Sequence, residues 1–222
     1  MNNENLIIIT TTLSNNEVSE KRRTNLINNF SKYNLSVILN HGIQRTSNLD
    51  NKEIMYKIIV NAFETFKKCN YEYAIICDDD FYPIDNFLNE LNNTVSLLPK
   101  NWQSLHLCPG YLWGRQFRDM TKLGKINPEY NMENISFDIS DRFYNNCNPK
   151  KYYNCNFWLG GPIAMLVNKN SINNILENFK NTYKMYRQPN DVILTLILDE
   201  NSFICKNPQL GYENEEGGST YT

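Results

Sequence analysis

The stretch YAIICDDDFYPIDNF, residues 73–87, decides the expected fold, because an apolar segment there stops abruptly at three carboxylates. Residues 73–77 form a short hydrophobic run, which is typical of a strand buried on both faces. Asp78, Asp79 and Asp80 follow directly and concentrate negative charge at the end of that strand. Holding such charge together is costly unless a cation neutralises it. The stretch therefore predicts a buried strand that delivers three acidic side chains to one edge of a sheet.

Strand and helix patterns alternate on both sides of this stretch. Two successive strand–helix units predict neighbouring parallel strands with helices on the faces, so we expect an α/β fold with one mixed, mostly parallel sheet flanked by helices. Ser14 with Glu17 forms a capping box for the first helix, and Asp50 or Asn51 caps the second. The expected strands are residues 6–10, 36–39, 73–77, 102–107 and 163–167, and the expected helices are residues 14–33, 51–66, 84–97 and 171–179.

The chain of 222 residues suits one domain, residues 1–222. The strand–helix alternation is clearest in residues 1–107. Periodicity fades after residue 108, where the sequence becomes polar and aromatic. Residues 188–200 read as a buried helix, although the run VILTLIL leaves a strand open, and the chain from residue 208 reads as loop.

The carboxyl ends of the expected strands define a ligand-binding edge, since ligands of open α/β sheets bind there. The loop Thr10, Thr11, Thr12 and the residue His41 lie at this edge beside the acidic triplet. Alternation at a strand end would turn Asp78 and Asp80 to one side and Asp79 to the other. Carboxylates are the ligands that Mg²⁺ and Mn²⁺ prefer, often together with substrate phosphates. The edge therefore predicts a nucleotide site with Asp78 and Asp80 as metal ligands.

The triplet admits two other interpretations. The carboxylates could cap the following helix, but Asp85 already suits that position. A strand that ends in Asp-x-Asp also opens phosphohydrolases that form an aspartyl-phosphate. In those the motif usually lies near the N-terminus and precedes Gly or Thr, whereas here Phe81, Tyr82 and Pro83 follow.

Bulk composition narrows the partners and the location. The net charge is −2, and this lack of a basic surplus argues against nucleic acid or an anionic membrane surface. The apolar run at residues 6–9 is too short for a signal peptide or a membrane span, so we expect a cytoplasmic protein without a membrane span. The six cysteines show neither a CxxC pair nor a zinc-like spacing, which predicts free thiols.

Several segments in this order resemble glycosyltransferase family 25, the lipopolysaccharide-type galactosyl- and glucosyltransferases. The resemblance rests on LIIITTTL (6–13) with Arg22 and Arg23, on the acidic triplet after its strand, on WLGGPIAMLVNKNSINNIL (158–176), on QPNDVIL (188–194) and on PQLGYENEEGGST (208–220). It implies the GT-A fold and inverting transfer of a hexose from a UDP-sugar, usually with Mn²⁺. The acceptor would be a glycan or a glycoprotein. We then expect residues 1–107 to be the nucleotide-binding half of the domain and residues 108–222 its acceptor-binding half.

The remaining candidate residues each have an ordinary structural alternative. Arg22 could reach the pyrophosphate, or lie on a helix surface. Gly160 and Gly161 could let the backbone approach the donor, or simply form a turn. Trp158 could stack on an acceptor sugar, or pack in the core.

Asp191 could bind the acceptor and remove the proton of its hydroxyl, or only cap a helix. With these residues we expect a metal-dependent glycosyltransferase that uses Mn²⁺ or Mg²⁺. The alternative is a non-catalytic nucleotide-sugar or glycan-binding protein on the same scaffold.

Overall fold

The computed structural model describes residues 1–12, 17–41, 50–108, 138–140, 143–145, 164–199, 201–205 and 210–213. The elements follow in chain order: β1 (Leu6–Thr12), α1 (Glu17–Ser31), β2 (Ser36–His41), α2 (Asn51–Lys68), β3 (Tyr73–Asp78), β4 (Phe81–Pro83), α3 (Phe87–Ser96), β5 (Ser104–His106), β6 (Asp138–Ser140), β7 (Phe143–Asn145), β8 (Ala164–Asn168), the 3-10 helix η3 (Lys169–Ser171), α5 (Ile172–Tyr186), α6 (Asn190–Leu196), β9 (Ser202–Cys205) and β10 (Gly211–Glu213).

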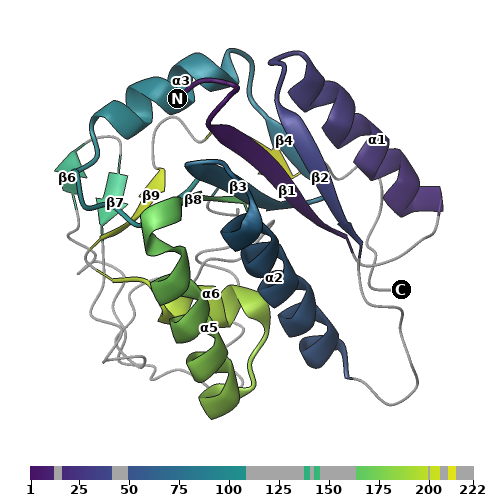
Figure 1. Ribbon diagram of the computed structural model, residues 1–222, viewed down its shortest axis with the longest axis vertical. Coiled ribbons are helices and arrows are strands. Elements are labelled where there is room, and N and C mark those ends of the chain that lie inside the picture. The colour runs from purple at the N-terminus through teal and green to yellow at the C-terminus, as the bar shows by residue number, and fades with distance from the viewer. Residues whose placement is uncertain are drawn as a thin grey trace.

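The described strands form one large sheet and one small one. The large sheet has the order β2-β1-β3-β8-β5-β9-β7-β6, and β4 pairs with β10 in a separate two-stranded sheet. In the large sheet β1, β2, β3, β5, β6 and β9 run in one direction, while β7 and β8 run in the other. The expected α/β fold with a mixed, mostly parallel sheet flanked by helices is confirmed (Figure 1).

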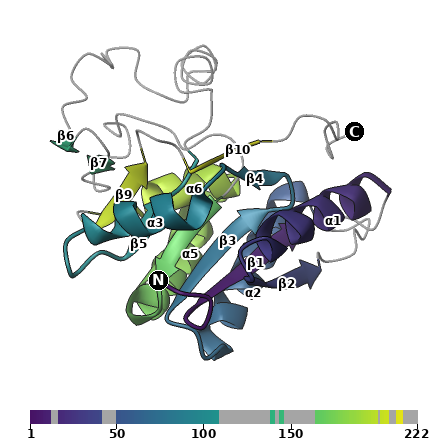
Figure 2. The same cartoon turned by 90° about the horizontal axis from the view of Figure 1, so that it is seen from above.

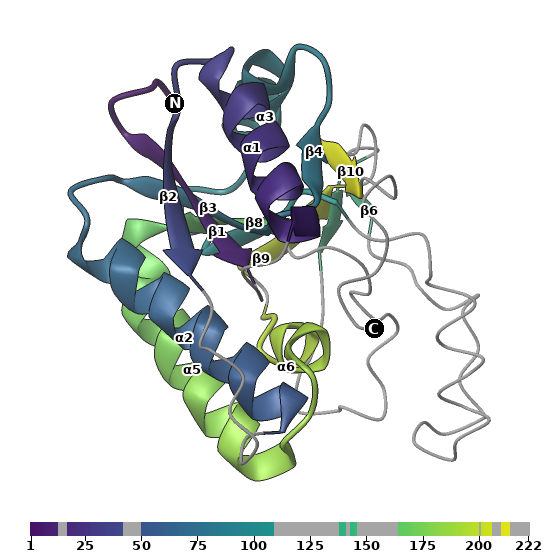
Figure 3. The same cartoon turned by 90° about the vertical axis from the view of Figure 1, so that its right-hand side faces the viewer.

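Two hydrophobic clusters lie on opposite faces of the sheet, and alternation along the strands assigns each residue to one of them. Ile7 and Ile9 of β1 join α2, α5 and α6 on one face, whereas Leu6 and Ile8 join α1 and α3 on the other. Figure 1 shows these two groups of helices on opposite sides of the sheet, and Figure 3 shows α2 and α5 packed alongside each other. The alternation also tells which face each polar residue at the strand ends belongs to.

The structure refines several expected elements. Asp50 is the N-cap of α2, and its side chain accepts a hydrogen bond from the backbone of Glu53. The helix expected at residues 171–179 continues to Tyr186, because Tyr183 still contributes to the buried face. Residues 188–200, whose sequence allows either a helix or a strand, are helical over Asn190–Leu196. None of the described helices is both long and apolar enough to cross a membrane.

Five short strands were missing from the sequence prediction, namely β4, β6, β7, β9 and β10. The largest correction concerns the end of the chain, where residues 211–213 pair with β4 instead of forming only loop. Figure 2 shows β4 and β10 next to each other, seen from above. Each of these strands has three or four residues, too few to display a recognisable alternation.

Candidate functional site

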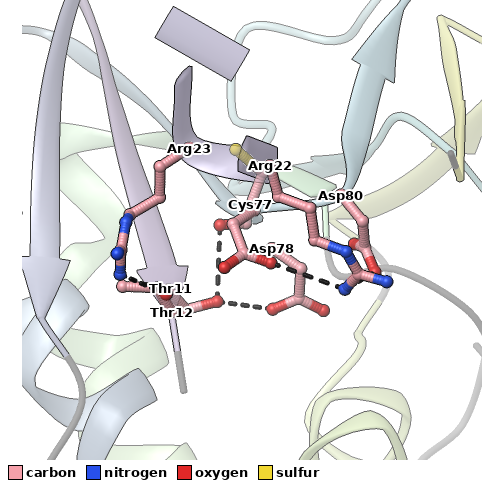
Figure 4. A network of polar contacts seen from close by, with 8 residues as sticks. Thr11, Thr12, Arg22, Arg23, Cys77, Asp78 and Asp80 are labelled. Atoms are coloured by element: carbon pink, nitrogen blue, oxygen red, sulfur yellow. Dashed lines mark hydrogen bonds and ion pairs between the residues drawn. The ribbon is translucent and has the colours of Figure 1, made fainter. Parts of the chain in front are cut away.

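A row of polar side chains crosses three strands at the carboxyl edge, on the face that α2, α5 and α6 cover. Thr11 is in register with Asn40 of β2 and with Asp78 of β3. The Thr11 hydroxyl donates to Asp78 Oδ1 at 2.5 Å, and the same hydroxyl lies 3.3 Å from the Cys77 carbonyl oxygen (Figure 4). Asn40 donates to the Ile58 carbonyl of α2 at 3.1 Å. Asp78 is therefore held by its neighbour on β1, on the side where α6 lies.

The other two carboxylates face α1. Arg22 Nη1 lies 3.1 Å from Asp80 Oδ2 and 3.7 Å from Asp79 Oδ1, so a single guanidinium group contacts both. Arg23 Nη1 donates to the Thr12 hydroxyl at 3.2 Å, and Thr12 in turn hydrogen-bonds to Asp79. Both arginines are only 7% exposed, which places their charge inside the protein. Figure 4 shows how these side chains converge from α1, β1 and the end of β3.

The triplet does not alternate as expected. Asp79 and Asp80 share Arg22, and it is Asp78 that belongs to the opposite face. The physical reason is that β3 ends at Asp78 and that residues 79–80 form a turn, so strand alternation no longer applies to them. The triplet therefore straddles the edge of the sheet.

The electrostatic balance of this cluster leaves it with excess negative charge. Three carboxylates and two guanidinium groups give −3 + 2 = −1. Burial raises the pKa of Asp79, while the hydrogen bond from Thr12 and the charges of Arg22 and Arg23 act in the lowering direction. Burial, together with the three carboxylates, also raises the pKa of the Cys77 thiol well above its ordinary value. Cys77 is thus a neutral thiol and no nucleophile.

The donor atoms at this edge suit a hard divalent cation. Carboxylate oxygens are the ligands such ions prefer, and Asp79 Oδ2 is buried with no hydrogen-bond partner among the described residues. Within the described part of the chain, no three His, Cys, Asp or Glu side chains gather as a metal-binding group. Mg²⁺ commonly binds through one or two carboxylates and completes its shell with substrate phosphates and water. The residues present fit a cation that is held by one or two of these carboxylates and completes its shell with substrate phosphates and water.

The structure brings together Thr11, Thr12, Arg22 and the triplet, all expected at the site. Thr10 lies at the same edge and is fully buried, and within the described part of the chain its hydroxyl has no hydrogen-bond partner. His41 ends β2, opposite Thr12 in register. The expected residues Trp158, Gly160 and Gly161 lie outside the described residues.

Asp191 is the second residue of α6 and is partly exposed. Since α6 belongs to the cluster on the Asp78 face of the sheet, Asp191 and Asp78 lie on the same side. The preceding residue, Asn190, is 3% exposed, and neither amide atom of its side chain has a hydrogen-bond partner in the residues that the structure describes. The sequence indicates Asn190 only as part of the start of the helix expected at residues 188–200, and the structure adds that its side chain is buried next to Asp191.

Comparisons with known proteins give matches in structure only: no protein-family model and no curated protein matches the chain. Protein A197 from STIV superposes with a TM-score of 0.49 and 13% identity, covering 96% of this chain and 87% of that one.

Two further solved structures are glycosyltransferases. One is involved in glycosylation of the major capsid of PBCV-1, with a TM-score of 0.45, 12% identity and coverage of 82% of this chain and 68% of that one. The other is a mutant of the Drosophila beta-1,4-galactosyltransferase 7 in complex with manganese, UDP-Gal and xylobiose. It gives a TM-score of 0.45 and 13% identity, covering 93% of this chain and 67% of that one.

Proposed function

We propose that this chain is a metal-dependent glycosyltransferase that moves a hexose from a nucleotide-sugar, expected to be a UDP-hexose, to a glycan or glycoprotein acceptor. The observation that carries the proposal is the cluster of Asp78, Asp79, Asp80, Arg22 and Arg23 at the carboxyl ends of β1 and β3. Its net charge of −1 would repel a diphosphate, and a divalent cation would reverse that sign. The likeness to glycosyltransferase family 25 supports the hexose and the UDP donor.

The two faces of the cluster suggest two tasks in donor binding. Asp78, held by Thr11, offers a carboxylate to ribose hydroxyls or to the metal. Asp80, on the α1 side, is the carboxylate we assign to Mn²⁺ or Mg²⁺, and Arg22 lies within reach of the same diphosphate. When bound, the cation would stabilise negative charge that develops on the departing diphosphate. Thr10, His41 and the backbone at Gly160 and Gly161 are the further donor contacts of this proposal.

The acceptor side of the reaction needs a base, because the attacking hydroxyl loses a proton while its oxygen bonds to C1 of the sugar. The bond between C1 and the diphosphate oxygen breaks, and UDP leaves with that electron pair. We assign the proton to the carboxylate of Asp191, which lies on the Asp78 side of the sheet. Trp158 would stack on the acceptor sugar. Attack from the face opposite the leaving group gives inversion.

The metal assignment is tested by titration calorimetry of UDP with and without Mn²⁺. We expect affinity in the wild type to depend on the cation, and Asp80→Asn to lose that dependence. Asp85→Asn is the matched control, because Asp85 is an exposed carboxylate five residues further along the chain. Unchanged metal dependence in Asp80→Asn would refute the assignment.

Turnover separates the enzyme from a binding protein. Incubation with UDP-hexoses and Mn²⁺ should release UDP, slowly with water and faster with a suitable acceptor. Metal-dependent UDP binding without UDP release on a broad acceptor panel would instead establish the non-catalytic alternative.

A further inference from the structure

Two tyrosines form an aromatic surface on the small sheet that begins directly after the acidic triplet. Tyr82 of β4 and Tyr212 of β10 are cross-strand partners in register. Their ring centroids lie 5.8 Å apart and their planes are tilted by 33°. This spacing is typical of a favourable aromatic pair, so the two rings form one continuous patch.

The opposite face of the small sheet anchors this patch to the core. Phe81 is fully buried and stacks on Phe30 of α1, with ring centroids 6.2 Å apart. A Cβ at Gly211 would approach the Phe81 ring to 2.1 Å, so β10 is seated as closely on this ring as glycine permits. Backbone hydrogen bonds from Ile84 to Leu210 and from Leu210 to Leu107 fix both strands further. The two tyrosines therefore stand on a rigid support.

The tyrosine face itself is turned to solvent. Tyr212 is 46% exposed even though it is paired with Tyr82, which is half-buried. Tyrosines on a rigid backbone provide apolar contact area at low entropic cost, and their hydroxyl groups can still hydrogen-bond. Such a surface suits a ligand with an apolar face and a polar rim, which describes a pyranose ring.

The position of the pair indicates which sugar it would meet. Tyr82 lies two residues after Asp80, a separation of at most about 7 Å between Cα atoms. The surface thus borders the carboxylate cluster assigned to the donor diphosphate. A sugar stacked there would lie beside the transferred hexose.

We propose that Tyr82 and Tyr212 form the binding surface for a pyranose ring of the acceptor glycan. This inference deepens the proposed function and rests on it for the role of the bound sugar. The ring stacks on the tyrosine pair with its apolar face, and its polar rim contacts the phenolic hydroxyls. The pair positions the acceptor and takes no part in bond making.

Saturation-transfer NMR with methyl β-glucopyranoside and methyl β-galactopyranoside tests this surface, in the presence of UDP and Mn²⁺. For the glycoside that binds, Tyr212→Leu should raise the Kd roughly three- to tenfold, the effect of losing one aromatic contact. Tyr212→Phe keeps the ring and should stay close to the wild type. Tyr186→Leu is the matched control, because Tyr186 is 42% exposed at the end of α5.

Parallel calorimetry of UDP with Mn²⁺ keeps the two proposals apart. Intact UDP binding in Tyr212→Leu with weakened glycoside binding supports the inference. If neither glycoside binds the wild type saturably, the inference is wrong, whatever the UDP result. It is equally wrong if Tyr212→Leu binds the glycoside with the same Kd as the wild type. If Tyr212→Leu weakens UDP and spares the glycoside, the surface belongs to the donor and the inference also fails. Ring-dependent glycoside binding without any metal-dependent UDP binding would instead keep the surface and refute the proposed transferase.

Discussion

Asp191 is the residue to which we assign proton removal from the acceptor hydroxyl. A carboxylate at the start of α6 is favoured by the helix dipole on ordinary grounds, so its role has to be separated from capping. Asp191→Asn keeps the shape and one capping oxygen but removes the basicity. A positioned general base contributes roughly 10²–10⁴-fold, so we expect kcat to fall at least about a hundredfold while UDP affinity and Tm stay nearly unchanged.

Steady-state kinetics with a saturating donor measure this change. Near-normal turnover in Asp191→Asn would reduce Asp191 to a helix cap. The search for the base would then turn to Asp138, Asp141 and the glutamates of residues 213–216.

His106 gives the fold a measurable dependence on pH. It lies in β5 between β8 and β9 and is 5% exposed, and none of the described residues hydrogen-bonds to its Nε2. Burial lowers its pKa from 6.5 to about 3. Between these two values the unfolded chain binds a proton that the native state does not. The free energy of unfolding therefore falls as the pH drops below about 6.5, by about 1.4 kcal/mol per unit from this group.

His106→Gln removes this titration, and urea unfolding at about pH 7 and about pH 5 should show it. Relative to the variant, the wild type should lose about 2 kcal/mol between the two conditions. Parallel pH profiles for the wild type and His106→Gln would contradict the assignment.

Among the contacts between elements, Lys169, the residue directly after β8, links that strand to the end of α2. Its Nζ donates to the carbonyl oxygens of Phe66, Lys67 and Cys69, at 2.6, 3.0 and 2.5 Å. It also lies 4.8 Å from the centre of the Phe66 ring. Carbonyls in the last turn of a helix lack most of their intrahelical partners, and that of Phe66 also accepts from the backbone of the C-cap residue Cys69. A cation that binds three such carbonyls completes the helix end.

Lys169→Met keeps most of the apolar stem and removes the donors. Hydrogen bonds to charged groups are worth about 1.5–3 kcal/mol, and we expect unfolding free energy to fall by about 2 kcal/mol in urea titrations. Lys180→Met is the control, because Lys180 pairs with Glu64 at 2.7 Å while both are one-third exposed. Exposed pairs contribute less, about 0.2–1 kcal/mol. Equal losses of unfolding free energy in the two variants would show that the hydrogen bonds of Lys169 at the end of α2 stabilise the protein no more than an exposed ion pair does.

The long elements could be predicted from the sequence because their patterns are local. The face of α2 repeats over eighteen residues, and its N-cap Asp50 stands next to it. The strands β4 and β10 are different, since three residues carry no period and their pairing joins distant parts of the chain. The strand at β8 was expected, but its antiparallel direction depends on the path of the connection before it.

The candidate site divides in the same way between local and distant signals. The acidic triplet is recognisable in the sequence as a run that ends a hydrophobic strand. The position of Thr11 beside it can also be predicted, because the carboxyl ends of adjacent parallel strands lie together. The contact of Arg22 with Asp80 spans 58 residues and depends on how α1 packs on the sheet. The assumption of alternation through residue 80 failed because the strand ends at Asp78. Sequence patterns locate charge, and packing decides what each charge faces.

At the scale of the whole molecule, the candidate site lies where the two hydrophobic clusters meet the edge of the sheet. Its side chains come from α1, which belongs to one cluster, and from β1 and the end of β3, whose strands contribute to both. Ligands that bind the native state stabilise it by mass action, by about 2.7 kcal/mol at a hundredfold excess over Kd. Mn²⁺ with UDP should therefore raise the Tm of the wild type and slow amide hydrogen exchange in α1, β1 and β3. The strands β6 and β7, at the far end of the sheet, should gain less protection.

Arg22→Gln shows whether the cation and the guanidinium neutralise the same carboxylates. Removing one partner of a buried ion pair costs about 3–5 kcal/mol, because the remaining charge stays buried and uncompensated. We therefore expect Arg22→Gln to lower the Tm strongly, and Mn²⁺ alone to raise it more in this variant than in the wild type, since the cation takes over part of the lost compensation. Differential scanning calorimetry with Mn²⁺, and with Na⁺ at equal ionic strength, measures the two increments. Equal increments in both proteins would mean that Mn²⁺ does not bind at Asp79 and Asp80, and the metal assignment would fall with it.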